Sequence, residues 1–407
     1  MIAFLKLALR NLGRNRRRSF FSALALALGF ALLLIMASFL RGEMESALQT
    51  SIRLQSGHLQ VRSSSYDEDK NSLKWEDLVN DPLALCAQIK ALPGVKDATP
   101  RLIASGILVA RDQSAGVRVL GLEPEAPASE PYRLGLLQGD FLAANDREGL
   151  LIGKPLADKL HLSVGDRVSL SVNTSNGDVD EQRFIVRGIY STQTYAFDSS
   201  TLLLPLAKAQ AMTRTENYAS LIFILLNKMA DSEAVRSRLT SLPYSVLDWK
   251  EMNEIIVQFE DMANSYMSIF YLIVLAITAS VITNTLIMAV FERTREIGIL
   301  SAIGWRSKEI VGLFLYETAL LTVGGILIGL ILGLAAVGYL ATHGFYIGGM
   351  GMSGFLIGDT IYAQLTLKDT VQLMIVTIVI TMLAGLYPAI LAARLEPVDA
   401  LRGGKHA

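Results

Sequence analysis

Residues 20–40 read FFSALALALGFALLLIMASFL, an apolar run without a single charged side chain. A helix needs roughly 20 such residues to cross the hydrocarbon core of a bilayer, so this run is long enough to span a membrane. It follows an arginine-rich segment and continues into Arg41 and Glu43 rather than into a small-residue cleavage site. These flanks favour a retained membrane anchor over a secretory signal that is removed.

Three further apolar runs, uncharged or nearly so, occupy the last third of the chain at residues 267–290, 311–339 and 371–391. The composition agrees with a chain that is only partly embedded in a membrane. Of its 407 residues, 51% are hydrophobic and 18% are charged, which is too apolar for an ordinary soluble protein and too polar for membrane helices alone. The sequence therefore predicts four transmembrane helices and a large domain outside the bilayer.

Basic residues in the short segments beside the spans predict the orientation, because lysine and arginine are in excess on the cytoplasmic side. These residues are Arg14, Arg16, Arg17, Arg18, Arg293, Arg295, Arg306, Lys308, Arg394, Arg402 and Lys405. Both termini are therefore expected in the cytoplasm. The loop between the third and fourth spans has little basic charge, which is typical of the opposite side. Its glycines are Gly344, Gly348, Gly349, Gly351 and Gly354.

The stretch between the first two spans, residues 41–266, would then lie on the outer side and is long enough to fold around its own core. Alternating apolar and polar residues between turn signals predict several strands. They are residues 56–62, 102–110, 117–121, 167–172 and 183–190. Asn176-Gly177 predicts a hairpin turn between the last two, and Asp231 predicts the cap of a helix that runs to Leu239. The expected class of this domain is α+β.

Two amphipathic segments flank this domain, residues 41–52 and 249–266. They could continue the first two spans outward as a stalk, which would link the domain mechanically to the bilayer. The alternative is a pair of surface helices that merely cover the base of the domain.

Motifs for catalysis and metal binding do not occur in the sequence. There is no G-x-x-x-x-G-K-[ST] nucleotide-binding motif, and the nearest string, residues 149–155, has Pro155 where a magnesium-binding hydroxyl is required. The four histidines, His58, His161, His343 and His406, are far apart and match no zinc motif, and there is no G-x-S-x-G string. We expect neither a catalytic nor a metal site. The single cysteine, Cys86, is expected to be a small buried residue rather than a reactive thiol.

One acidic residue, Glu317, lies well inside a predicted span, where an ionisable group is costly. An interhelical hydrogen bond or a snorkelling carboxylate is favoured, with a proton-carrying role as the alternative. In the same span Gly325, Gly329 and Gly333 recur every four residues and so line one helix face, which lets a neighbouring backbone approach closely. These glycines predict a packing face that is compatible with dimerisation.

The segment ERTREIGILSAIGW, residues 292–305, begins with charges and continues with apolar residues at helical spacing. This pattern predicts a short amphipathic helix at the membrane surface. A separate motor protein could bind such a helix, or it could be an ordinary interfacial helix whose basic residues fix the topology. The candidate contact residues are Glu292, Arg293, Arg295, Glu296, Gly298, Leu300, Gly304 and Trp305.

That segment and the ending YPAILAARLEPVDALR, residues 387–402, resemble the FtsX-like permease family. The opening LALRNL, residues 7–12, with the arginines after it, follows the same family plan, as does one long loop after the first span followed by three distal spans. The resemblance covers the whole chain and is to MacB-type (type VII) ABC transporter permeases. Within the family, SGHLQV at residues 56–61 and the string at 184–206 look most like the lipoprotein-releasing LolC/LolE branch.

The resemblance implies a dimer, with a second permease copy or a paralogue, that works with two copies of a separate cytoplasmic ABC ATPase. That ATPase would bind ATP and Mg²⁺, and no cofactor is expected in this chain. Residues 292–305 would be the coupling helix seated on the ATPase, and residues 41–266 would be a domain of MacB periplasmic-core type. The implied location is the inner membrane of a bacterial cell, with membrane lipid as a further partner and no nucleic acid.

The resemblance favours a permease that releases or exports lipoprotein or another hydrophobic cargo on the outer side. One subunit of the lipoprotein-releasing branch grips a carrier through a projecting hook, whereas residues 172–183 of this chain read as a tight polar hairpin. The alternative is an FtsX-type signalling scaffold that activates an external enzyme without transport, and a membrane-embedded enzyme is a third hypothesis.

The expected order of segments follows from these assignments. It is a cytoplasmic segment at 1–19, spans at 20–40, 267–290, 311–339 and 371–391, an outer domain at 41–266, a coupling segment at 291–310, an outer loop at 340–370 and a cytoplasmic tail at 392–407.

Overall fold

The computed structural model describes residues 2–14, 16–67, 70–347, 356 and 358–395 of the chain. The chain divides into two compact units. The helical unit comprises Met1–Glu43, Glu260–Phe345 and Tyr362–Ala407, and the outer domain comprises Met44–Phe259 and Tyr346–Ile361. Most of the predicted glycine loop and the basic residues Arg402 and Lys405 lie outside the described residues.

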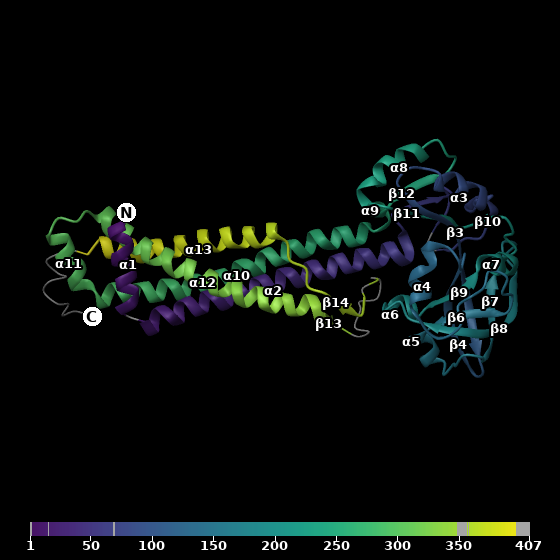
Figure 1. Ribbon diagram of the computed structural model, residues 1–407, viewed down its shortest axis with the longest axis horizontal. Coiled ribbons are helices and arrows are strands. Elements are labelled where there is room, and N and C mark those ends of the chain that lie inside the picture. Colours follow the sequence, from purple (N-terminus) through teal and green to yellow (C-terminus); the bar gives the residue numbers. More distant parts are fainter. Residues whose placement is uncertain (1, 15, 68–69, 348–355, 357, 396–407) are drawn as a thin grey trace. The chain divides into compact units, whose positions relative to one another are not determined.

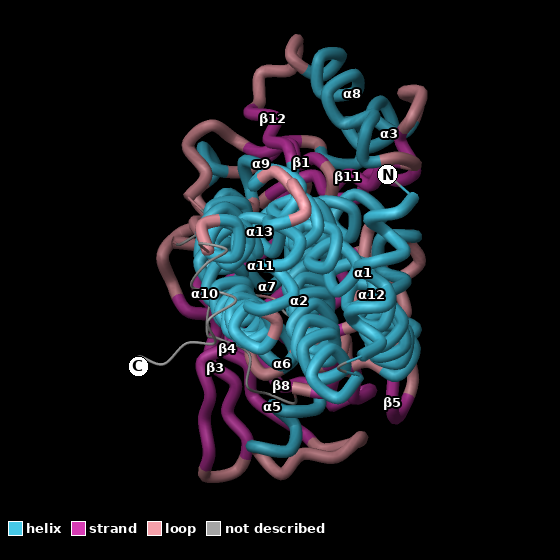
Figure 2. The backbone as a smooth tube through the Cα atoms, turned by 90° about the vertical axis from the view of Figure 1, so that its left-hand side faces the viewer, coloured by secondary structure: helices cyan, strands magenta, loops and turns pink. Residues whose placement is uncertain are grey.

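In the part of the chain that the structure describes, four helices are long and apolar enough to cross a membrane, which confirms the predicted number of spans. They are α2 (Arg16–Ser51), α10 (Glu254–Glu292), α12 (Ser307–His343) and α13 (Leu367–Ala393). Each of the four predicted runs falls within one of these helices. In the helical unit they lie alongside one another (Figures 1 and 2), and two shorter helices, α1 (Ile2–Arg14) and α11 (Thr294–Ala302), lie at the same end of the bundle (Figure 1).

Close packing of α2 against α12 explains the repeated glycines of the third span. A Cβ atom added to Gly329 would lie 2.5 Å from the carbonyl oxygen of Ala27 on α2, and Gly325 and Gly333 face Leu26 and Leu34 in the same way. Side chains larger than hydrogen would therefore push the two backbones apart. Within the described helical unit this glycine face is occupied by α2 of the same chain.

The outer domain is built on a ten-stranded mixed sheet in the order β12-β1-β11-β3-β4-β9-β6-β8-β5, with β7 pairing to both β3 and β8. Its strands are β1 (Leu59–Arg62), β3 (Val95–Ala110), β4 (Gln113–Leu122), β5 (Leu136–Gly139), β6 (Gly149–Gly153), β7 (Arg167–Asn173), β8 (Val179–Tyr190), β9 (Thr201–Pro205), β11 (Leu221–Leu226) and β12 (Ser245–Asp248). Most neighbours are antiparallel, whereas β4–β9 and β6–β8 are parallel. The short strands are β2 (Val79–Asn80), β10 (Tyr218–Ala219), β13 (Phe345–Tyr346) and β14 (Thr360–Ile361).

Short helices complete the outer domain. They are α3 (Pro82–Lys90), α4 (Glu130–Leu134), α5 (Lys154–Lys159), α6 (Tyr195–Asp198), α7 (Leu206–Thr213), α8 (Ser232–Leu239) and α9 (Trp249–Met252), with 3-10 turns at Trp75–Asp77, Pro127–Ser129 and Met229–Asp231 and a π-helical turn at Ile52–Ser56.

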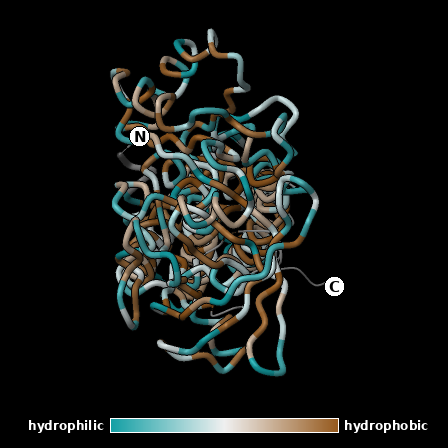
Figure 3. Tube along the Cα trace, turned by 90° about the vertical axis from the view of Figure 1, so that its right-hand side faces the viewer, coloured by the Kyte–Doolittle hydropathy of each residue, from teal (hydrophilic) through white to brown (hydrophobic). Residues whose placement is uncertain are grey.

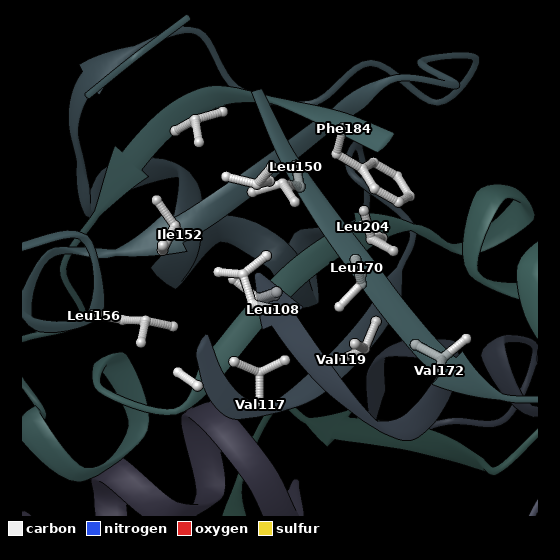
Figure 4. Packing of buried hydrophobic residues seen from close by; sticks show 14 of the residues in the cluster. Leu108, Val117, Val119, Leu150, Ile152, Leu156, Leu170, Val172, Phe184 and Leu204 are labelled. Carbon is white, nitrogen blue, oxygen red and sulfur yellow. The ribbon is translucent and has the colours of Figure 1, made fainter. Parts of the chain in front are cut away.

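Alternating apolar residues of the strands form the main core of the outer domain, where Leu108, Leu150, Leu170 and Phe184 are fully buried (Figure 4). Brown apolar and teal polar stretches alternate along its chain in Figure 3, as expected for strands with one buried face. The predicted α+β class of the domain is confirmed.

Most of the predicted local structure is correct. The last four predicted strands fall within β3, β4, β7 and β8, and the turn at Asn176-Gly177 joins β7 to β8, with Gly177 at φ +85°. The prediction at residues 56–62 is wrong in its first half, because the strand begins only at Leu59 after the π-helical turn. Asp231 holds the N-cap position of α8, yet its side chain caps no backbone N–H, since a 3-10 turn leads directly into the helix.

The two amphipathic segments beside the outer domain differ from each other. Helix α2 runs without a break from the first apolar run to Ser51, so its outward extension is one continuous helix. The segment at 249–266 is not continuous, because α9 ends at Met252 and α10 begins at Glu254, with Asn253 between them.

Candidate functional site

A cluster of charged and polar side chains lies at the α1–α11 end of the helical unit. The charged cluster, as defined here, consists of Asn11, Arg14, Arg18, Glu292, Arg293, Glu296 and Glu317. At its centre the Glu317 side chain, only 3% exposed, accepts a hydrogen bond from Asn11 Nδ2 at 2.6 Å and pairs with Arg293 at 3.0 Å. The carboxylate therefore fastens α1 and the start of α11 to α12, which is an interhelical hydrogen bond of the predicted kind.

The outer part of the charged cluster ties α1 directly to α11. Arg14 donates to Glu296 at 2.6 Å, Arg293 contacts the same carboxylate at 3.2 Å, and Arg18 of α2 pairs with Glu292 at 2.8 Å. The hydrogen bond from Arg14 holds the pKa of Glu296 below its ordinary value. Arg14 of α1 and, through Arg293, Glu317 of α12 thereby hold the first turn of α11 in place.

The remainder of α11 presents an exposed, partly apolar face. Arg295 is exposed, Ile299 is 43% exposed, and Ile303, which directly follows the helix, is 74% exposed. The apolar side chains on the other side of the helix pack into the unit, with Ile297 buried and Trp305 half-buried against it.

The other candidate contact residues of the segment 292–305 lie within α11 or beside its ends. Gly298 is buried within α11 and Leu300 is half-buried. Gly304, at φ +102°, ends the helix in a conformation that favours glycine, and the N–H of Trp305 returns to the carbonyl of Leu300 at 3.1 Å. Glu292 is the last residue of α10, so the predicted amphipathic helix is shorter than residues 292–305.

A second polar cluster lies in the outer domain, where α2 ends. The junction, as defined here, consists of Ser51, Leu54, Ser56, Arg101, Tyr132 and Asn253. The carbonyl oxygen of Leu54, in the π-helical turn, accepts hydrogen bonds from Arg101 at 2.7 Å and from the Tyr132 hydroxyl at 2.8 Å. Arg101 is buried and lies 3.4 Å from the ring centroid of Phe223. A cation at this position also complements the negative end of the helix dipole.

The same junction joins the end of α2 to the start of α10. Ser51 donates a short hydrogen bond to the side-chain oxygen of Asn253, whose nitrogen donates to Ser56 at 3.2 Å and to the carbonyl of Trp249 at 2.7 Å. All three polar side chains are buried. The break between α9 and α10 is thus one position at which the two long helices are joined.

Two titratable groups of the outer domain, the buried Cys86 and the half-buried His58, lie outside the junction. Among the described residues no group of three or more His, Cys, Asp or Glu side chains could hold a metal ion. Cys86 is buried in α3, as predicted, and burial raises its pKa to about 12. His58 accepts a hydrogen bond from the N–H of Leu226 at 3.3 Å, and burial lowers its pKa.

The sequence alone does not identify every member of the two clusters. Arg14 and Arg18 have a sufficient explanation as topology signals, although their contacts are with the predicted coupling residues. Asn11 lies within the LALRNL string, which is a usable signal. The junction residues, polar side chains and the backbone carbonyl of Leu54, are scattered over 203 positions from Ser51 to Asn253 and carry no spacing that would reveal them.

Protein-family models match most of the chain. The model of a MacB-like periplasmic core domain matches residues 19–242, and the model of the FtsX-like permease C-terminal region matches residues 268–397. The second match contains α11, α12 and α13 and most of α10.

Curated relatives are similar over nearly the whole chain. The lipoprotein-releasing system transmembrane protein LolE of Haemophilus influenzae is 24% identical, over 94% of this chain and 93% of the relative. LolC of Neisseria meningitidis serogroup B is 23% identical over 97% and 98%. The macrolide export ATP-binding/permease protein MacB of Shewanella sp. (strain ANA-3) is 25% identical over 98% of this chain, which spans only 60% of that relative.

A solved structure is also similar in the outer domain. The periplasmic region of MacB from Actinobacillus actinomycetemcomitans aligns with 51% of this chain and 97% of its own length, at 15% identity and a TM-score of 0.36.

Proposed function

The chain belongs to the FtsX-like permease family of ABC transporters and carries a MacB-like periplasmic core domain, and on that premise we propose that it couples ATP hydrolysis by a separate cytoplasmic ATPase to motion of its outer domain. The work performed is the release or export of lipoprotein or another hydrophobic cargo. ATP and Mg²⁺ are held by the ATPase, and this chain is a non-catalytic membrane subunit. The single observation that carries the proposal is α11, an exposed, partly apolar face held by the charged cluster.

The orientation supports contact with a cytoplasmic motor. Arg16 and Arg17 begin α2, Arg293 is the N-cap residue of α11 and Arg295 lies within it, and α1 and α11 lie at one end of the helical unit (Figure 1). Because positive charge marks the cytoplasmic side, this end faces the cytoplasm and both termini lie there, in the inner membrane of a bacterial cell.

The ATPase binds the exposed side of α11. Side chains that contribute nothing to internal packing, above all Ile303, are available for burial in a partner protein. Movement of α11 is passed to Glu317 through Arg293, and so to α12. Two ATPase copies serve two permease chains, either two copies of this chain or this chain with a paralogue.

The cargo assignment rests on the relatives named for lipoprotein release, LolE and LolC, which align over nearly their full lengths. The tight β7–β8 hairpin (Arg167–Asn173 and Val179–Tyr190) differs from a projecting hook, so cargo is released without a carrier bound at that hairpin.

Purification of the full chain from native membranes in mild detergent tests the motor assignment. We expect an ATPase with nucleotide-binding motifs to co-purify, and Ile303→Glu to abolish its recovery because a charge would then be buried in the interface. The matched control is Leu83→Glu, a 57% exposed apolar residue on α3 of the outer domain. Recovery of the ATPase with the Ile303 variant, or its absence with the native chain, would contradict the proposal.

Reconstitution with labelled lipoprotein tests the cargo. Release that depends on ATP and is lost in Glu296→Ala supports transport, because Glu296 holds α11 against α1. ATP hydrolysis that activates an external enzyme with no release would instead support the signalling scaffold.

A further inference from the structure

Beside the junction the outer domain contains a cavity of about 630 Å³. Its buried lining includes Ser56, Gln60 and Asn253, whereas Glu254 and Ile255 are exposed and form its mouth. The volume is in the range of ordinary ligand sites in proteins. Neither the charged cluster nor the contacts that fasten α2 account for this space.

Gln60 supplies an unused hydrogen-bond acceptor in this cavity. Its neighbours in β1, Leu59 and Val61, point into an apolar core, so Gln60 points to the opposite face of the sheet. The side chain is 3% exposed and its nitrogen donates to the carbonyl of Gln55 at 2.9 Å. Its oxygen, Oε1, is buried and has no hydrogen-bond partner among the described residues. Buried carbonyl oxygens are nearly always paired, so this one indicates a donor that a ligand would bring.

The first turn of α10 supplies the complementary donors. Residues 254–256 line the cavity, and the N–H groups of a first helical turn have no intrahelical acceptor. The side chain that could cap them, that of Asn253, is engaged by Ser51, Ser56 and Trp249 instead. The cavity therefore offers one buried acceptor that has no partner among the described residues and several donors at one wall, and its lining also includes the charged residues Arg118, Glu251 and Glu254.

An uncharged amide group matches this arrangement, because it carries an N–H donor and a C=O acceptor. An ammonium group would satisfy Gln60 but not the helix donors, and an anion would do the reverse. Apolar side chains in the lining, those of Met252, Ile255 and Ile256, provide surface for the side chains of a peptide.

We propose that this cavity binds a short peptide segment through its main-chain amides. The inference rests on the proposed function, in which the segment belongs to the cargo polypeptide. Because Ser51 and Asn253 line the same cavity, an occupant contacts the residues that join the end of α2 to the start of α10. Occupancy of the site is thereby linked to the helices that carry motion from the motor.

Photolabelling of the detergent-purified full chain tests the site. The probe is N-acetyl-alanyl-photoleucyl-alanine methylamide, which has amide groups and no charge. We expect saturable labelling of peptides that contain β1 or the first turn of α10, blocked by excess N-acetyl-trialanine methylamide and not by ethanolamine. Labelling elsewhere only, or block by ethanolamine as effective as block by the tripeptide, would overturn the proposal.

Three variants test whether photolabelling depends on the cavity. Gln60→Met keeps the side-chain volume and removes the unused acceptor, and should weaken probe binding about tenfold. Ile255→Trp narrows the mouth without disturbing buried residues and should weaken labelling as well. Gln138→Met, at an exposed position of β5, should label like the native chain. Unchanged labelling in both cavity variants would overturn the proposal even if one of them folded poorly.

The outcome is separable from that of the proposed function, because recovery of an ATPase does not depend on Gln60. Absent labelling with normal ATPase recovery overturns the peptide site alone. Specific labelling without any ATPase overturns the motor assignment alone.

Discussion

The charged cluster of the helical unit and the junction of the outer domain hold the same two helices, α2 and α10, by different chemistry. In the charged cluster, Arg18 of α2 meets Glu292 of α10 through a partly exposed ion pair. In the junction, Ser51 and Asn253 meet through buried, uncharged hydrogen bonds. Partly exposed ion pairs can be exchanged at small cost, whereas a fully satisfied buried network is rigid. The attachment in the charged cluster, called the adjustable end here, is therefore easier to rearrange than the attachment in the junction, called the fixed end.

The largest expected effect is at Glu317, the one buried anion of the charged cluster. Glu317→Leu leaves Arg293 without its buried partner and Asn11 without an acceptor. Loss of one member of a buried pair costs about 3–5 kcal/mol, so the free energy of unfolding of the helical unit should fall by that order. Denaturant titration in detergent measures it. Glu317→Gln, which keeps an acceptor for Asn11, should lose less, and equal losses in the two variants would show that the retained acceptor contributes nothing beside the lost charge.

A smaller loss is expected in the junction from Asn253→Ala. The change removes the partner of Ser51, Ser56 and the Trp249 carbonyl, and unsatisfied buried groups cost about 1–3 kcal/mol. Hydrogen exchange should then accelerate in the π-helical turn, Ile52–Ser56. The control is Asn264→Ala, at an exposed position of α10. If exchange in Ile52–Ser56 were unchanged, the junction would not be the rigid end of the comparison.

The membrane spans and most strands were predictable because their signals are local. Apolar length alone identifies residues 20–40 as a span, and alternation identifies β7 and β8 as a hairpin around Asn176-Gly177. The strand at 56–62 was mispredicted because the π-helical turn at Ile52–Ser56 depends on Arg101 and Tyr132, which are distant in sequence.

The candidate site also has a part that local sequence signals predict and a part that depends on distant residues. Residues 292–305 could be predicted as a coupling segment from their pattern and family resemblance, since the segment is continuous in sequence. The partners that position Glu296, chiefly Arg14, come from another helix, and basic residues near a span already have a sufficient explanation in topology. The orphaned oxygen of Gln60 could not be predicted, because burial of one side of β1 depends on the tertiary fold.

A smaller loss of stability is expected at the fixed end from Tyr132→Phe. The variant loses only the hydroxyl that donates to the Leu54 carbonyl, and that carbonyl still accepts a hydrogen bond from Arg101. The aromatic ring at position 132 still stacks on Phe197. One hydrogen bond contributes about 1 kcal/mol, so the outer domain should lose that order of stability. The control is Tyr195→Phe, at a 49% exposed position, with no expected change. A loss several times larger would mean that the hydroxyl, rather than Arg101, holds the turn.

The smallest effect is expected at the exposed pair Arg14–Glu296, and it should depend on salt and pH. The pKa of Glu296 is lowered in the folded protein, chiefly by the hydrogen bond from Arg14, so its contribution is present above the unfolded glutamate value of about 4.3 and is lost as pH falls through the lower folded value. Hydrogen exchange of α1 amides measures this contribution. At neutral pH and low salt, Glu296→Gln should exchange slightly faster than the native chain.

That difference should disappear at 1 M salt, where charges are screened beyond about 3 Å, and at a pH below the folded pKa of Glu296, where the native carboxyl is itself uncharged. Exchange in the π-helical turn of the junction should show no such salt dependence, because Ser51 and Asn253 carry no charge. If exchange in the junction depended on salt as strongly as exchange in α1, or if exchange in α1 did not depend on salt, the distinction between the adjustable and the fixed end would be wrong. Movement of the proposed ATPase would then have to be transmitted through the apolar packing of α11, at Ile297 and Trp305, rather than through its ion pairs.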